Sequence, residues 1–482
     1  MLVPSRALLA RWIALGPRFL PFADAASADL PLSRLLRLSL FQVSVGMALV
    51  LLIGTLNRVM IVELHVPASL VAVMVALPVL YAPLRALIGF RSDNHRSALG
   101  WRRVPFIWMG TLIQFGGFAV MPFALLVLSG GGNASQWPAW VGQLGVGLCF
   151  LLVGAGLHTT QTAGLALATD LAPQETQPRV VGLMYTMLLI GTIISAFIFG
   201  AFLREFSPAR LVQVLQAAAL ATMVLNTIAL WKQESRRPQP RAEARHAAAA
   251  PSFTQAWGEF IEGDGTRRRL VAIALGAVAF GMQDVLLEPY GGQVLGMDVG
   301  ATVWLTAMLA LGGLAGFSIA SVVLGRGADP ARMAMAGAAV GLAGFAALLA
   351  TAAQHSVAWL YVGATLVGLG GGLFGHGTLT MTMNRAPKAH VGLALGAWGA
   401  VQATAAGAAL AFGGLLRDGV ALLADRGWLG TALADTATGY AFVYALEWVL
   451  LLATLVVLRQ LVGDSRAATP ARPAAVLQRS TQ

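Results

Sequence analysis

The stretch that decides the fold is Gly89–Arg103, which reads GFRSDNHRSALGWRR and separates two long apolar segments. A much shorter polar turn would reverse the chain, so a loop of this length with four arginines needs a further reason. Gly89 lets two helix ends approach closely, and Asp93 can cap or pair with the helix ends that it faces. The arginines lie where anionic lipid headgroups would meet them. The residues that form this motif are Gly89, Asp93, His95, Arg96, Gly100, Arg102 and Arg103.

The composition on both sides of this loop is that of a membrane protein. The chain has 482 residues, of which 57% are hydrophobic and 11% are charged, and its mean hydropathy is +0.73. A water-soluble globule of this length would need more charged surface. The apolar runs reach the ~20 residues that a membrane-spanning helix needs. They are continuous rather than alternating, which excludes an outer-membrane barrel. We therefore predict an all-α membrane protein.

The apolar runs divide into two sets of six. We predict twelve spans, at Leu38–Val62, Ala68–Phe90, Val104–Leu128, Ala139–Thr169, Arg179–Leu203, Ala209–Trp231, Leu270–Pro289, Ala301–Leu324, Arg332–Ala352, Ala358–Thr382, Val391–Leu416 and Tyr440–Leu461. The Arg-, Pro- and Ala-rich linker 232–269 separates the sixth span from the seventh. Because Gly89-x-x-x-Asp93 recurs as Gly325-x-x-x-Asp329 after the eighth span, we predict two parallel six-helix repeats. This arrangement and the loop motif resemble the major facilitator superfamily.

The predicted organisation follows from these limits. Residues 1–37 form an interfacial segment, 38–231 the first six-helix bundle, 232–269 the linker, 270–461 the second bundle and 462–482 a tail. Within the second bundle, 417–439 is expected to form a short amphipathic helix on the periplasmic face. Most of the 32 Lys and Arg residues fall on the side of the linker, which predicts that both termini are cytoplasmic. The formal charge of +11 is thus a matter of topology and does not indicate nucleic-acid binding.

Polar residues inside two spans indicate a first candidate site. Ionisable groups there cost about 2.5–3.5 kcal/mol each on insertion scales, so they need an explanation. One set lies toward the outer end of the first span and the other at comparable depth in the seventh; the residues are Asn57, Arg58, Glu63, Gln283, Asp284 and Glu288. Two interpretations stay open. The set forms a polar site between the halves in which Arg58 meets a carboxylate, or it is structural, as a buried ion pair between the repeats or, for Glu63 and Glu288, by simple exposure at the membrane interface.

Two histidines indicate a second candidate site. His158 lies midway along the fourth span in GAGLHTTQTAGLALATD, with Gln161 nearby, and His376 lies in the glycine-rich tenth span in GLGGGLFGHGTLTMT. A neutral imidazole among glycines can ligate the metal of a flat macrocycle, or it can hydrogen-bond a neighbouring helix. The glycines themselves indicate either tight packing or room for a flat ligand. Arg85, in the second span, is expected to snorkel or to pair with the Asp93 loop.

Other chemistry finds no support in the sequence. There is no phosphate-binding glycine loop and no nucleophile–base pair, so we predict that the protein is not an enzyme. The single Cys149 excludes an intramolecular disulfide and is expected to be a small core residue.

Two long motifs, GFRSDNHRSALGWRRVPFIWMGTLIQFGGFAVMPFALLVLSG and HTTQTAGLALATDLAP, resemble the PucC/LhaA group, also called the bacteriochlorophyll delivery family. The resemblance covers the twelve spans, and of the two types it favours LhaA. It implies an assembly factor that places bacteriochlorophyll a in antenna α and β polypeptides of the bacterial inner or intracytoplasmic photosynthetic membrane. The LhaA type would serve light-harvesting 1 around the reaction centre, and the PucC type light-harvesting 2.

The resemblance also implies partners and ligands. Bacteriochlorophyll synthase, the membrane insertion machinery and membrane lipids are candidate partners, and carotenoid, quinone and phospholipid are candidate ligands besides the pigment. His158 becomes the candidate axial ligand of the pigment magnesium, with His376 and Gln161 as further candidate contacts. Two other functions stay open: a secondary transporter of a small solute or tetrapyrrole, and a passive scaffold for antenna polypeptides.

Overall fold

The computed structural model describes residues 25–27, 30–80, 85, 88, 92, 100–173, 176–234, 261–262, 265–385, 391–430 and 433–467. Helices are the only regular structure within these ranges. The motif residues Gly89, Asp93, His95 and Arg96 lie outside them, as do most of the predicted interfacial segment, the centre of the linker and the end of the tail.

The helices of the first half run from Leu32 to Leu230. They are α2 Leu32–Leu38, α3 Leu40–Leu49, η2 Val50–Leu56, η3 Val59–Glu63, α4 Ala68–Leu80, α6 Val104–Leu128, η4 Gly132–Gln136, α7 Ala139–Leu171, α8 Gln177–Phe202 and α9 Pro208–Leu230. The first span is thus a nearly continuous helix whose second part, η2 and η3, has π-helical turns. Such turns are uncommon and often accompany functional sites.

The helices of the second half run from Thr266 to Ala467. They are α11 Thr266–Gly281, η6 Met282–Val285, α12 Leu287–Gln293, α13 Val299–Gly325, α14 Pro330–Gln354, α15 Val357–Arg385, α16 Val391–Asp425 and α17 Ala437–Ala467. The seventh span is therefore broken in its middle by the 3-10 turn η6. Two of the later helices begin with an aspartate that caps them: Asp298 Oδ1 accepts a hydrogen bond from Ala301 N at 2.8 Å, and Asp329 Oδ1 accepts one from Ala331 N at 2.9 Å.

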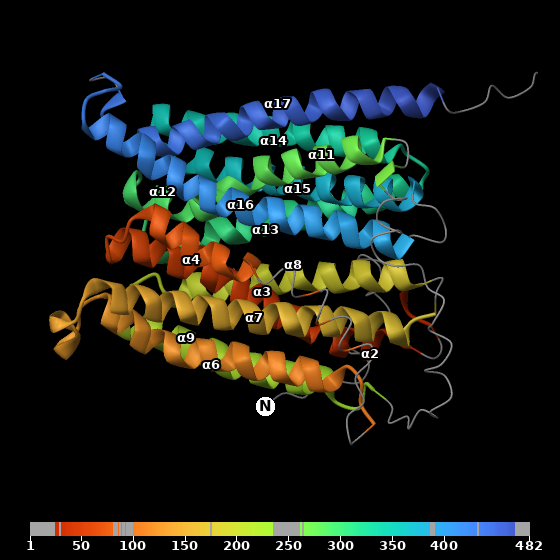
Figure 1. Cartoon of the computed structure of the whole chain (residues 1–482), viewed down its shortest axis with the longest axis horizontal. Coiled ribbons are helices and arrows are strands. Elements are labelled where there is room, and N and C mark those ends of the chain that lie inside the picture. Colours follow the sequence, from red (N-terminus) through yellow and green to blue (C-terminus); the bar gives the residue numbers. More distant parts are fainter. Residues whose placement is uncertain are drawn as a thin grey trace, which may run out of the picture.

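Eleven helices in the described ranges are long and apolar enough to cross a membrane, and Ala68–Pro78 is a shorter apolar helix at the place of the predicted second span. The protein is therefore a multi-pass membrane protein. Figure 1 shows the helices of the two halves as two adjacent bundles that share one long axis. Side chains from both halves, such as Val59 and Val285, belong to one continuous hydrophobic core, so the bundles are packed together.

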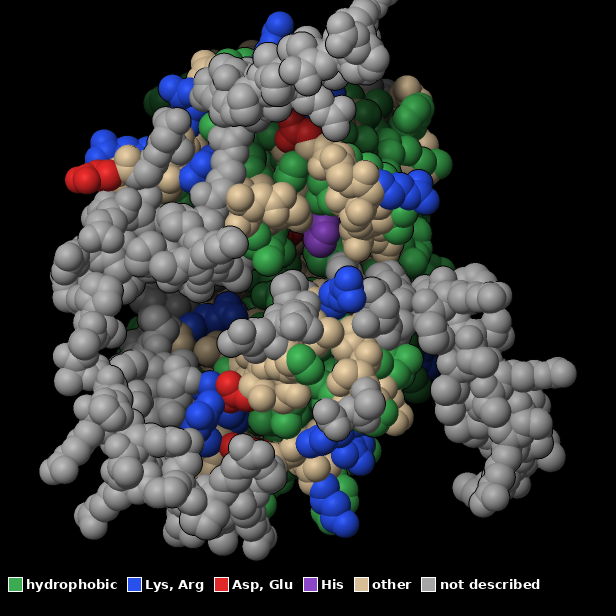
Figure 2. All heavy atoms as spheres, turned by 90° about the vertical axis from the view of Figure 1, so that its right-hand side faces the viewer, with side chains coloured by type: hydrophobic (Ala, Val, Ile, Leu, Met, Phe, Trp, Pro, Cys, Tyr) green, Lys and Arg blue, Asp and Glu red, His purple; other side chains and the backbone are tan. Residues whose placement is uncertain are grey.

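The end of the bundle at which the linker begins is rich in basic side chains. Figure 2 looks onto the end from which the linker emerges, and Lys and Arg side chains outnumber acidic ones on the visible described surface. This distribution follows the sequence pattern from which we predict that this end is cytoplasmic.

One predicted element has a different form. The sequence predicts that the eleventh span ends at Leu416 and that a separate amphipathic helix covers 417–439, but α16 continues without a break to Asp425. Arg417 and Asp418 lie within α16, where they form an ion pair at 2.8 Å. Because the two charges pair, the free-energy cost of placing them in a spanning helix is lower than for unpaired charges, and the helix continues past them.

Candidate functional site

The first polar set of the sequence lies where the first and seventh spans meet. Asn57 Nδ2 donates to the carbonyl of Val285 at 2.7 Å, and Arg58 Nη2 donates to the carbonyl of Met297 at 3.1 Å. Arg58 Nη1 also forms an ion pair with Glu63. Carbonyls at and beyond the break in the seventh span thus accept hydrogen bonds from the first. Polar contacts do join the halves here, and the carboxylate that Arg58 contacts is on its own helix.

Glu288 occupies the interior of the same region. It is 1% exposed, it accepts a hydrogen bond from Thr306 Oγ1, and its carboxylate lies where a side chain at Gly54 would be. Its Oε2 atom has no hydrogen-bond partner within the described ranges. Gly54 is therefore needed to make room for a buried acid of the opposite half.

A further buried acid, Glu447 on α17, was missed by the sequence analysis. It is fully buried, and its Oε1 accepts a hydrogen bond from the backbone N of Gln283 at 2.7 Å, while the Gln283 side chain donates to Asp284. Glu447 thus binds the backbone at the break between α11 and η6. The signal in the sequence is the single acidic residue of the span Tyr440–Leu461.

A second group of contacts joins the halves at the end opposite the linker. We call it the Gln293 cluster, and it consists of Ser69, Gln293, Arg417, Asp418 and Tyr440. Gln293 Oε1 accepts from Arg417 Nη2 at 2.7 Å and from the Tyr440 hydroxyl at 2.6 Å. Asp418 Oδ2 accepts from the backbone N of Ser69 at 2.6 Å and so caps α4 from the other half.

The second candidate site surrounds His158 in the first half. We call it the His158 cluster, and it consists of Gln42, Arg85, His158, Gln161 and Thr162. Arg85 Nε donates to Thr162 Oγ1 at 3.1 Å and Arg85 Nη2 to Gln161 Oε1 at 3.2 Å. Gln161 Nε2 donates to Gln42 Oε1 at 3.2 Å, and Thr162 Oγ1 donates to the His158 carbonyl at 2.7 Å.

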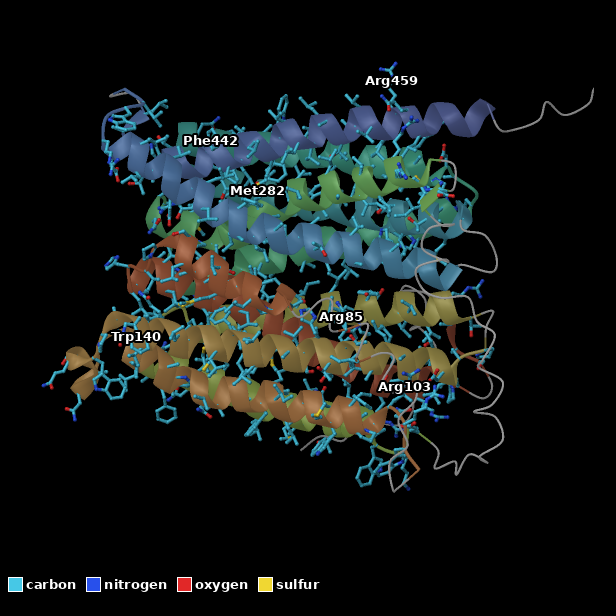
Figure 3. All side chains as sticks on the ribbon, in the orientation of Figure 1. Arg85, Arg103, Trp140, Met282, Phe442 and Arg459 are labelled. Carbon is cyan, nitrogen blue, oxygen red and sulfur yellow. The ribbon has the colours of Figure 1, made fainter. Side chains whose placement is uncertain are left out.

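The cluster brings three predicted spans together at mid-depth. Because His158, Gln161 and Thr162 are three and four residues apart, they share one face of α7. Figure 3 shows Arg85 near the middle of the molecule, beside α7 of the first half. Arg85, which is expected to snorkel or to pair with the Asp93 loop, donates hydrogen bonds to two side chains of α7; Asp93 itself lies outside the described residues. This contact joins the second span to the fourth, so the local sequence around Arg85 could not predict it.

His376 lies in the other half, on α15. Its ring contacts the edge of Phe317 on α13, with centroids 4.4 Å apart and an interplanar angle of 69°. The two histidines thus have different surroundings, one polar and one aromatic.

The glycines of α15 serve mainly for packing. A Cβ atom at Gly368 or Gly372 would collide with backbone of α13, and one at Gly370 would collide with backbone of α14. Two glycines are different: a Cβ at Gly371 would meet only Phe280, at 3.9 Å, and one at Gly375 would meet nothing within 4 Å. The structure therefore supports the packing interpretation for most of the run and leaves open space beside Gly375 alone.

The described part of the loop motif forms an ionic network at the linker end. Arg102 and Arg103 bind Asp170 Oδ2 at 2.7 Å and 2.9 Å, and Arg103 also donates to Ser92 Oγ at 2.6 Å. The Glu234 carboxylate accepts from the backbone N atoms of Arg102 and Arg103, and Val104, at 2.7–3.2 Å. The start of the linker therefore caps α6.

The PUCC protein family matches residues 55–466 of the chain. This chain belongs to the PucC family. It is 62% identical over 416 residues to Protein PucC of Rhodovulum sulfidophilum, a match that covers 86% of this chain and 92% of the relative. It is 56% identical to Protein PucC of Cereibacter sphaeroides, with 95% and 98% covered. A protein from the puhA-bchM intergenic region of Rhodobacter capsulatus is 53% identical, with 93% of both chains covered.

Solved structures agree on the fold. A bacterial homologue of the human lysosomal transporter Spinster, in an inward-facing and unoccupied conformation, aligns with a TM-score of 0.63 at 15% identity and covers 90% of this chain and 98% of its own. The POT family transporter PepTSo aligns with a TM-score of 0.62 at 12% identity, with 90% of this chain and 99% of that chain covered. This PucC-family chain therefore has the major facilitator fold, as the sequence predicted.

Proposed function

We propose that this PucC-family chain is an assembly factor for a photosynthetic antenna, that it binds bacteriochlorophyll a, and that it helps to place the pigment in antenna α and β polypeptides without acting as an enzyme. Membership of the PucC family supports an assembly role of the PucC type. The observation that carries the pigment proposal is that the Nδ1 atom of His158 has no hydrogen-bond partner among the described residues.

His158 fits the magnesium of the pigment. It is partly buried on α7, and its Nδ1 atom has no hydrogen-bond partner among the described residues. Buried polar atoms are normally satisfied, so an orphaned imidazole nitrogen needs an explanation. Chlorin magnesium takes an axial ligand, and histidine is a common one. We propose that His158 is that ligand, with Gln161 and, in the other half, His376 as further contacts.

The chain's own residues would hold and orient such a ligand. Thr162 Oγ1 donates to the His158 carbonyl, and Arg85 binds the same face of α7, so the turn that carries the imidazole is fixed by side chains from a neighbouring span. The apolar interior of the bundle would supply most of the affinity for the pigment body.

The proposal also concerns which antenna the protein helps to assemble. The relatives named Protein PucC are 62% and 56% identical to this chain, against 53% for the protein from the puhA-bchM intergenic region. We therefore put the peripheral antenna, light-harvesting 2, before the core antenna around the reaction centre. The proposal includes the photosynthetic inner membrane as location, cytoplasmic termini, and contact with bacteriochlorophyll synthase and the insertion machinery.

Purification from phototrophic cells tests the proposal. Near-infrared absorption of the purified chain should show bound bacteriochlorophyll, and co-purified antenna polypeptides, identified by mass spectrometry, would decide between the peripheral and the core antenna. His158→Ala should lose most of the pigment, whereas His355→Ala should retain it, because His355 is an exposed residue just after α14. Pigment-free wild-type protein, or equal pigment in both variants, would contradict the role given to His158.

A further inference from the structure

The His158 cluster contains a cation, Arg85, that has no anionic partner among the residues that the structure describes. The two hydrogen bonds that Arg85 donates go to neutral oxygens, Thr162 Oγ1 at 3.1 Å and Gln161 Oε1 at 3.2 Å. They use Nε and Nη2. Arg85 Nη1 donates to no residue of the described ranges, and within the same ranges no carboxylate forms an ion pair with Arg85.

Two other arginines inside the spanning helices are treated differently. Arg58 pairs with Glu63, and Arg417 pairs with Asp418. An arginine side chain stays protonated in proteins, and a charge inside a membrane protein is normally paired or marks a binding pathway. Arg85 is only partly buried, so its remaining donors are not sealed inside the helix bundle.

The two hydrogen bonds of Arg85 also fix where an anion would bind. Gln161 and Thr162 hold the guanidinium beside the face of α7 that carries His158, because the three residues are three and four positions apart. A planar guanidinium binds carboxylate and phosphate oxygens through parallel hydrogen bonds. A ligand that binds both Arg85 and His158 has a hydrophobic body, a metal ion that an imidazole nitrogen can ligate, and an anionic oxygen group.

We propose that Arg85 binds the anionic oxygen group of a hydrophobic ligand, and that for the pigment this group is the free propionate of the unesterified magnesium tetrapyrrole. This inference rests on the proposed function, because it concerns which form of the pigment the same site takes. The esterified pigment has no such carboxylate. The site therefore prefers the free acid to the long-chain ester, and an anionic lipid headgroup is the other source of the same chemistry.

Binding to the purified full chain in neutral detergent tests the proposal. Quenching of tryptophan fluorescence reports the Kd for bacteriochlorophyllide a, the free acid, and for bacteriochlorophyll a, the ester. A third titration uses phosphatidylglycerol against phosphatidylcholine. The variants are Arg85→Gln, Arg85→Lys, which keeps the charge, and Arg210→Gln as a control, because Arg210 is exposed and pairs with Glu205. Gel filtration and thermal melting show that each variant is folded.

The wild-type chain should bind the free acid about tenfold more tightly than the ester, the size expected for one charge-assisted hydrogen-bonded pair. Arg85→Gln should abolish this preference, and Arg85→Lys should keep part of it. Equal affinity of the wild type for both forms would overturn the inference while leaving the proposed function intact. Binding of phosphatidylglycerol that depends on Arg85, without a preference for the free acid, would assign the site to lipid and overturn the tetrapyrrole arm. Failure of both pigment forms to bind would overturn the proposed function itself.

Discussion

At the residue scale, the buried charges of the first span show how the chain lowers the cost of ionisable groups in the membrane. Arg58 is 3% exposed, and it is stabilised by Glu63 and by the carbonyl of Met297. The Glu63 side chain is 35% exposed. The two partners therefore depend unequally on the pair: Glu63 alone can be solvated, whereas Arg58 alone cannot.

This asymmetry makes a prediction. Glu63→Gln should destabilise the protein by about 2 kcal/mol, because it leaves a buried cation without its anion. The double variant Arg58→Met/Glu63→Gln should be more stable than Glu63→Gln alone, because the orphaned charge is gone. Thermal melting in detergent measures both, with the exposed Glu205→Gln as a control that should change little. Additive losses in the double variant would show that the pair acts as two independent groups.

At the element scale, α15 combines two kinds of glycine on one helix. Gly372 lies so close to α13 that an added Cβ would collide with the carbonyl of Gly313, whereas a Cβ at Gly375 would have open space. Small residues that let helices approach closely are a general means of packing in membranes. The first kind therefore determines the distance between α13 and α15, and the second does not.

A matched pair of substitutions separates these roles. Gly372→Ala should lower the melting temperature by several degrees, because α13 must move to accept the methyl group. Gly375→Ala should leave it unchanged or raise it slightly, since alanine favours helix by up to about 1 kcal/mol where nothing is displaced. Thermal melting of the two variants side by side is the measurement. A similar loss at both positions would mean that backbone flexibility, and not contact, explains the glycines.

The elements also show what the sequence can reveal. The third span was predicted at Val104–Leu128 and is found there, because polar residues flank a continuous apolar run. The end of α16 was predicted too early, because Arg417 and Asp418 look like loop residues until their partners are known. The same holds for the sites: His158 stood out within its span, but the bonds of Arg85 to α7 depend on a contact between distant segments. Local sequence patterns therefore predict the membrane spans, whereas the partners of the polar side chains depend on tertiary contacts.

At the scale of the whole molecule, the halves are joined by polar contacts at the end opposite the linker. The Gln293 cluster connects α4 of one half with α12, α16 and α17 of the other, and Asn57 adds a contact to Val285. A solute carrier with this fold would have to break these contacts in each cycle. An assembly factor that takes its pigment from within the membrane and releases it there has no need to.

Cross-linking across this end distinguishes the two modes of action. The single cysteine, Cys149, is buried, so Cys149→Ser gives a background in which Ser69→Cys and Asp418→Cys can be joined by a short thiol cross-linker. Ser69 N and Asp418 Oδ2 are 2.6 Å apart, so we expect efficient cross-linking. Antenna assembly, measured by near-infrared absorption of the membranes, should remain at the level of the two single-cysteine variants. Loss of assembly in the cross-linked protein alone would instead show that the halves must separate at this end, as in a transporter that alternates between two open states.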